Sequence, residues 1–173
     1  MRIERVWAVP NKWTFSIKPI KKLLQEEMNG DLWIDPYAGM NSPAKIKNDI
    51  NPTMKTDYHL DALEFIKMFD DESVNGVLLD PPYSYRQISD CYKELCLPVD
   101  MHTTQSSWYL RVQRQIRRIL KPGGKVICCG WNSNGINDKK NFSVTRVLLV
   151  AHGSHRNDTI VTVQERLNGS LFK

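Results

Sequence analysis

Apolar residues recur along the chain in two patterns, which predict helices and strands in alternation. Apolar positions three or four residues apart predict helices over residues 16–28, 61–69, 85–95 and 108–120. Shorter apolar runs predict strands over 32–35, 46–49, 55–59, 77–80, 125–130, 143–151 and 159–164. This alternation indicates an α/β fold with a mostly parallel sheet covered on both faces, and the last two strands are expected to form a closing antiparallel hairpin.

Residues that start and stop helices support these boundaries. Asp61 is placed to cap the second helix, and Glu64 three residues later completes a capping-box-like pair. The Lys-Pro-Gly-Gly run at 121–124 stops the fourth helix and leads into the next strand. The chain therefore carries local signals that agree with its apolar pattern.

Length and composition predict one ordinary globular domain over residues 1–173. The chain has 173 residues, of which 41% are hydrophobic and 25% charged. No apolar run is long enough to span a bilayer and the start does not resemble a signal peptide, so we expect a cytoplasmic protein with no membrane partner. The net charge of +5 permits a polyanionic partner. No carboxylate or cysteine lies at a suitable metal-ligand spacing from His152 and His155, so we expect a turn between two strands there and no metal site.

The motif Asp80-Pro81-Pro82-Tyr83 follows directly on the apolar run 77–79. The apolar run predicts a strand that is buried on both faces, and the prolines end its hydrogen-bond ladder. Asp80 is therefore expected at the carboxyl end of a strand, where open α/β sheets bind their ligands.

These four residues suit the chemistry of a planar aromatic amine. Such an amine is a poor nucleophile because its lone pair is delocalised into the ring. The Asp80 carboxylate and the Pro81 carbonyl could each accept a hydrogen bond from the amine and localise that lone pair, while Tyr83 stacks on the base. The alternative is a proline-rich turn with a capping Asp and a packing Tyr, and the buried strand favours the first interpretation.

Nearly the whole chain resembles the S-adenosyl-L-methionine-dependent amino-methyltransferases, in particular the small phage-type N6-adenine DNA methyltransferases. Asp80-Pro81-Pro82-Tyr83 is similar to that family's catalytic motif, with the Asp that is more typical of N6-adenine than of N4-cytosine enzymes. The resemblance implies a Rossmann-like class I methyltransferase sheet, S-adenosyl-L-methionine as cofactor and DNA as partner.

The resemblance also implies which residues bind the cofactor: Trp13, Phe15, Asp35, Pro36, Tyr37, Gly39, Asp49 and Asp61. Residues 35–39 are similar to the family's first cofactor loop, Asp49 falls where the ribose hydroxyls are bound, and Asp61 falls where the adenine amine is met. Trp13 and Phe15 are similar to the segment that closes over the methionine end. The alternatives are a helix cap for Asp61, a turn for Asp49 and core packing for Trp13 and Phe15.

The chain departs from the family's pattern in two places. Few residues separate Gly39 from the strand at 46, so the usual first crossover helix is expected to be reduced. No sizeable insert for reading DNA is present, so we expect weak or very short sequence recognition. Arg86, Trp131 and Asn132 are the candidate acceptor-binding residues beside Tyr83, although Trp131 could equally pack in the core.

The sequence leaves three functions to weigh. The first is methyl transfer to the N6 amine of adenine in DNA, in a bacterial or phage-infected cytoplasm, with the base flipped or single-stranded. The second is the same chemistry on RNA, cytosine N4 or a protein amide. The third is a non-catalytic nucleic-acid-binding or partner-dependent subunit, which the reduced crossover motivates. The oligomeric state is not predicted.

Overall fold

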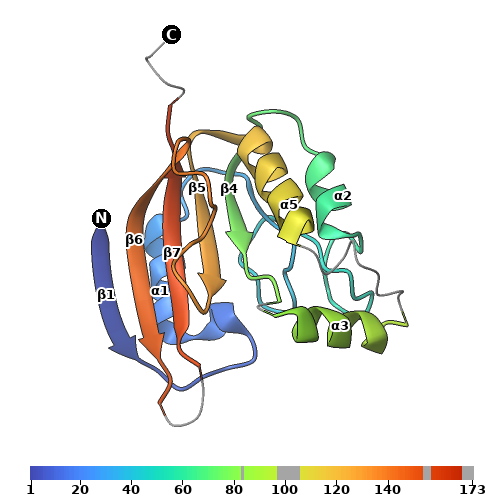
Figure 1. The fold of residues 1–173 in the computed structure, drawn as a ribbon, viewed down its shortest axis with the longest axis horizontal. Coiled ribbons are helices and arrows are strands. Elements are labelled where there is room, and N and C mark those ends of the chain that lie inside the picture. The colour runs from blue at the N-terminus through green and yellow to red at the C-terminus, as the bar shows by residue number, and fades with distance from the viewer. Residues whose placement is uncertain (83, 97–105, 154–156, 169–173) are drawn as a thin grey trace.

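The computed structural model describes residues 1–82, 84–96, 106–153 and 157–168. Within these residues, seven strands form one sheet in the order β1-β6-β7-β5-β4-β2-β3 (Figure 1). In chain order, the elements are β1 (Arg2–Trp7), η1 (Thr14–Ser16), α1 (Lys18–Glu27), β2 (Trp33–Asp35), β3 (Ile46–Lys47), α2 (Ala62–Lys67), β4 (Val74–Leu79), α3 (Tyr85–Glu94), α5 (Ser106–Ile119), β5 (Leu120–Gly130), β6 (Phe142–Ala151) and β7 (Thr159–Arg166). In the described residues, no helix has the length and apolar character needed to cross a membrane.

The alternating side chains of β4 build a hydrophobic core on each face of the sheet. Val77 and Leu79 pack in one cluster with apolar residues of α2 and α5. Leu78 points to the opposite face and packs in a second cluster with residues of α1. The apolar run before Asp80 is thus buried on both faces, as its sequence predicts.

Strand pairing confirms the predicted α/β class with its closing hairpin. β2, β3, β4 and β5 pair in parallel, whereas β7 is antiparallel to both β5 and β6. α5 ends at Ile119, next to its predicted end, but β5 already begins at Leu120, and residues 121–124 form a bulge within it. A bulge tolerates the proline that a regular ladder would exclude.

The prediction was wrong for two strands at the edges of the sheet. Residues 55–59 do not form a strand, because Tyr58 makes only an isolated bridge to Asn48. Conversely, β1 was not predicted and pairs in parallel with β6. Its outward residues Ile3 and Trp7 are each 68% exposed, so β1 lacks the apolar run of a buried strand.

The connection from β2 to β3 carries no helix, as the short spacing in the sequence predicts. Residues 36–45 are turns and irregular backbone, although β2 and β3 are parallel neighbours. Trp33 and Ala44 are buried here and pack in the same cluster as α1. The Trp33 ring lies so close to Gly76 that a Cβ at position 76 would overlap it. A large aromatic side chain therefore fills part of the space on this face.

Candidate functional site

The carboxyl ends of the parallel strands open into one broad cleft of about 1620 Å³. Part of its wall comes from segments that follow strands: Pro36, Tyr37 and Gly39 after β2, Asp49 after β3, Asp80 to Pro82 after β4, and Trp131 with Asn132 after β5. Residues of α3 and α5 line the rest, among them Gln87, Cys91 and Tyr109. Parallel strands bring these distant segments to one edge of the sheet, which is the usual ligand site of such folds. The predicted strand-end residues are thus gathered at one place.

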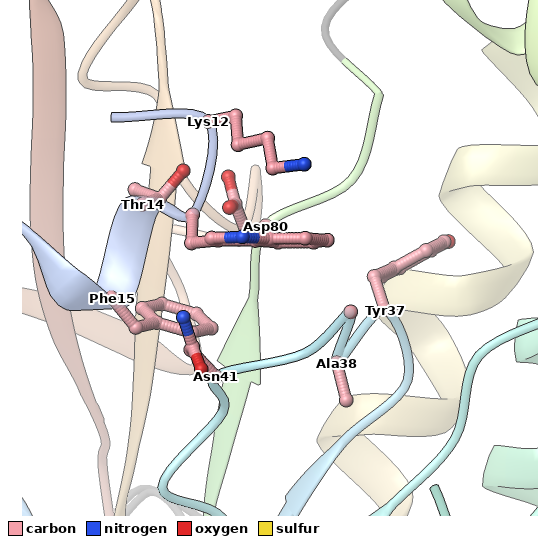
Figure 2. Close-up of a pocket in the computed structure, with 9 residues that line it drawn as sticks. Lys12, Thr14, Phe15, Tyr37, Ala38, Asn41 and Asp80 are labelled. Atoms are coloured by element: carbon pink, nitrogen blue, oxygen red, sulfur yellow. The ribbon is translucent and has the colours of Figure 1, made fainter. Parts of the chain in front are cut away.

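A smaller pocket of about 160 Å³ adjoins this cleft at Asp80. Residues 12–15 line it together with Tyr37, Ala38, Gly39 and Asn41, and Asn41 lies beside Phe15 in Figure 2. The Lys12 ammonium lies 4.8 Å from the centre of the Trp13 ring. Asp80, Trp13, Tyr37 and Gly39 line both cavities, so the two lie next to each other.

Asp80 lies at the junction of the two cavities. It follows the last residue of β4, and its side chain is turned into the small pocket in Figure 2. Pro81 and Pro82 continue from it along the wall of the broad cleft. Tyr83, which the sequence predicts to stack on the acceptor, lies outside the described residues. The described part of the motif therefore faces the space where two ligands could meet.

Gly39 lets the first loop pass close beneath Trp13. Its φ is +52°, a left-handed conformation that glycine adopts readily. A Cβ at this position would lie 3.0 Å from the Trp13 ring. The Gly39 amide donates to Asp49 Oδ2 at 2.9 Å, which fixes the loop against the end of β3. A larger residue would intrude on the pocket and strain the loop.

Asp49 and Asp61 hold the backbone and also line the cleft. Asp49 Oδ1 accepts from the Asn51 amide at 2.9 Å, and Asp61 Oδ1 accepts from the Leu63 amide at 2.8 Å. The cap that the sequence predicts for α2 is thus present, although Glu64 pairs with Lys67 instead of completing the capping box. A carboxylate has about four lone-pair sites, so these bonds leave capacity for a ligand.

Asp35 lies beneath the first loop and does not line either cavity. Its side chain is fully buried, and Oδ1 accepts from the Tyr37 amide at 2.9 Å. Oδ2 has no hydrogen-bond partner of ordinary geometry among the described residues. Burial raises the pKa of Asp35 to about 7, against the opposing effect of the Ser42 hydroxyl and the Tyr37 amide, and the nearby Asp80 and Asp49 carboxylates raise it further. Asp35 thus acts on the site through the loop above it.

Four of the remaining predicted residues line the cavities, and Arg86 does not. Phe15 is buried in the core and also lines the small pocket, and Trp13 lines both cavities, so packing and pocket roles coexist. Trp131 is 45% exposed on the cleft wall, which argues against core packing, and Asn132 lies beside it. Arg86 does not line the cleft and instead projects from α3, 3.8 Å from Asp90.

Three buried side-chain amides near the cleft escaped the sequence analysis. Asn48 is fully buried at the end of β3, Gln113 is buried on α5 and Gln164 is buried on β7. All three bond to the backbone of loops that form the cleft. Their signal in the sequence is a polar residue within an apolar pattern, which does not by itself reveal a partner.

Comparisons with known proteins agree on the fold. No protein-family model matches the chain. The sequence is 31% identical over 104 residues to the type II methyltransferase M.BamHI of Bacillus amyloliquefaciens, in a match that covers 54% of this chain and 24% of that protein. The chain therefore spans about a quarter of the length of this relative.

Several solved structures share the arrangement of the sheet. TrmN of Thermus thermophilus has a TM-score of 0.57 at 16% identity, over 87% of this chain and 49% of its own. The 1,6-didemethyltoxoflavin-N1-methyltransferase of Burkholderia thailandensis, solved with S-adenosylhomocysteine, has a TM-score of 0.56 at 10% identity, over 86% of this chain and 76% of its own. SMU.1697c of Streptococcus mutans has a TM-score of 0.52 at 16% identity, over 87% of this chain and 97% of its own. The fold is that of the class I methyltransferases, and the identities are too low to transfer more than the fold.

Proposed function

We propose that this protein transfers a methyl group from S-adenosyl-L-methionine to the N6 amine of adenine in DNA. The observation that carries the proposal is the place of Asp80, where the small pocket meets the broad cleft. A carboxylate that lines both cavities is within reach of a cofactor in one and an acceptor in the other. The 31% identity to a type II methyltransferase supports methyl transfer as the reaction class.

The residues around the small pocket suit the proposed cofactor. Gly39 leaves a space that a Cβ would fill, and Trp13 and Phe15 offer aromatic surface beside it. Asp49 and Asp61 place carboxylate oxygens on the adjoining wall, which suit hydroxyl and amine donors of a nucleoside. When bound, S-adenosyl-L-methionine supplies an electrophilic methyl group on a positively charged sulfur.

The chain's own groups prepare the acceptor. The Asp80 carboxylate and the Pro81 carbonyl accept hydrogen bonds from the two amine protons, which localises the nitrogen lone pair. Because Pro81 and Pro82 fix the backbone, little freedom remains to be lost when the acceptor binds. Catalysis then rests on positioning and polarisation, with no covalent enzyme intermediate.

The broad cleft gives room for a base that has left its stack. The N6 amine of adenine is not reachable inside a duplex, so the base must be flipped or single-stranded. Trp131 offers an exposed ring on the cleft wall for stacking, and Asn132 offers an amide for a base edge. Tyr83 stays the predicted stacking residue, and Arg86, which projects from α3 outside the cleft, is proposed to contact the phosphate backbone.

The test is transfer of tritium from labelled S-adenosyl-L-methionine to duplex DNA, single-stranded DNA, RNA and protein, followed by nucleoside analysis. We expect N6-methyladenine in DNA, with little dependence on flanking sequence. Label on cytosine, RNA or protein alone would overturn the acceptor assignment. Failure to bind the cofactor at millimolar concentration in calorimetry would favour a non-catalytic nucleic-acid-binding module.

A further inference from the structure

Asn48 joins two walls of the cofactor side of the cleft. Its side-chain nitrogen donates to the carbonyls of Pro36 at 3.0 Å and Leu60 at 2.9 Å, and its side-chain oxygen accepts from the Leu60 amide at 2.8 Å. The first bond reaches the loop after β2, and the other two reach the residue before Asp61. One fully buried side chain thus sets the spacing between these two loops.

Gln164 makes an equivalent connection on the acceptor side. Its side-chain oxygen accepts from the Ile136 amide at 2.6 Å, and its side-chain nitrogen donates to the Ile136 carbonyl at 3.0 Å. Gln113 supports the same loop from α5, where its oxygen accepts from the Asn137 amide at 3.2 Å. This loop begins with Trp131 and Asn132 on the cleft wall.

Both amides satisfy backbone groups that no helix or strand would otherwise pair. A buried donor or acceptor left without a partner destabilises a protein, so breaking one of these contacts lowers stability and each loop is held against its amide. The left-handed Gly135, at φ +53°, brings the loop so near Gln164 that a Cβ would overlap the amide. The contacts are therefore built into the shapes of the two loops.

We propose that Asn48 and Gln164 are positioning residues that set the two halves of the cleft independently. This inference rests on the proposed function: Asn48 acts on cofactor binding through Asp61 and the Pro36 loop. Gln164, which also lines the cleft, acts on acceptor binding through the loop that begins with Trp131. Their bonding partners are separate, so a change at one residue leaves the other half in place.

The test uses a matched pair of isosteric variants, Asn48→Asp and Gln164→Glu. Each keeps one oxygen to accept from the loop amide but sets a second oxygen against a backbone carbonyl. Calorimetry gives the dissociation constant for S-adenosyl-L-methionine, and steady-state kinetics give KM and kcat for the acceptor that the wild type labels. We expect Asn48→Asp to weaken cofactor binding about 10-fold and leave the acceptor KM unchanged. We expect Gln164→Glu to raise the acceptor KM about 10-fold and leave cofactor binding unchanged.

Thermal unfolding of both variants separates positioning from a general loss of stability. The proposal is supported if both variants lose equal stability but each changes only one quantity, the cofactor dissociation constant or the acceptor KM. It is overturned if both quantities change in each variant in proportion to its loss of stability. If a variant does not fold, hydrogen exchange of the wild type still tests the inference. Cofactor binding should protect the Leu60 amide from exchange and leave the Ile136 amide unchanged. Equal protection of both amides would contradict the inference. A wild type that does not bind S-adenosyl-L-methionine would overturn the proposed function as well, which distinguishes the two failures.

Discussion

Buried amides support the loops of both halves of the cleft, but the candidate ligand-binding residues of the two halves differ in how they are held. On the cofactor side, hydrogen bonds to buried or half-buried groups hold the loops after β2 and β3: the Gly39 amide donates to Asp49, and the Asn48 side chain donates to the Pro36 carbonyl. On the acceptor side, the described candidates project into solvent: Trp131 is 45% exposed and the Arg86 side chain is 91% exposed. The comparison teaches that the candidate cofactor residues lie in a pre-formed polar frame, whereas the candidate acceptor residues are side chains on the surface.

The largest effect is expected from a substitution at Asp80, which lies where the two halves of the cleft meet. We expect Asp80→Ala to lower methyl transfer about 10²–10³-fold, the scale of losing one pre-organised polar group, while cofactor binding is largely kept. Tritium transfer and calorimetry measure the two quantities separately. Asp71→Asn, which changes an exposed carboxylate paired with Arg118, is the control. Near-normal turnover in Asp80→Ala would remove this residue from the mechanism.

The next effect concerns the buried carboxyl under the cofactor half. Burial, the main cause, raises the pKa of Asp35 to about 7, so between roughly pH 4 and 7 the folded protein holds a proton that the unfolded chain has released. Stability should therefore fall as pH rises through this window, by up to about 4 kcal/mol. Asp35→Asn keeps an acceptor for the Tyr37 amide and should flatten the profile. Urea unfolding from pH 5 to 8 measures this, and identical profiles for both proteins would contradict the buried-acid account.

A smaller effect separates local strain from ligand binding. Gly39→Ala places a Cβ against Trp13 in left-handed backbone, which should destabilise the protein by about 1–2 kcal/mol and weaken cofactor binding. Gly123→Ala is the matched control, because Gly123 has φ +74° but open space around its Cβ position. We expect similar losses in thermal stability and a changed dissociation constant only for Gly39→Ala. Unchanged cofactor binding in Gly39→Ala would place the ligand elsewhere.

The smallest effect tests the exposed acceptor surface. If Arg86 meets a phosphate, Arg86→Ala should raise the acceptor KM a few-fold at low salt and reduce its dependence on salt by about one counterion. Arg2→Ala removes an exposed arginine at the opposite edge of the sheet and should change neither quantity. If both variants change the acceptor KM and its salt dependence equally, Arg86 contributes only to the overall positive charge of the protein and not to a specific phosphate contact.

The sequence predicts best where one local signal decides the structure. The apolar run before Asp80 and the amphipathic pattern of α5 specify buried elements without knowledge of their neighbours. β1 could not be found this way, because its place depends on pairing with β6 at the far end of the chain. The strand expected at 55–59 was wrong, since only Tyr58 of this segment makes a bridge, to Asn48 just beyond the end of β3.

For the candidate site, the sequence indicates side chains better than contacts. Asp49, Gly39 and Asp80 stand out because they follow strand ends, and the fold brings them together there. Asn48 stands beside Asp49 in the sequence, yet its two partner loops are fixed only by the folded backbone. The buried position of Asp35 likewise depends on the turn of the loop above it.

The helix-free passage from β2 to β3 has a consequence for the order of folding. Joining two parallel strands through residues 36–45 closes a small loop, so little chain entropy is lost when they meet. The contact of Arg2 with Arg146 closes a loop of nearly the whole polypeptide. The floor of the cofactor pocket is therefore expected to assemble early during refolding, and the outermost strand is expected to dock last.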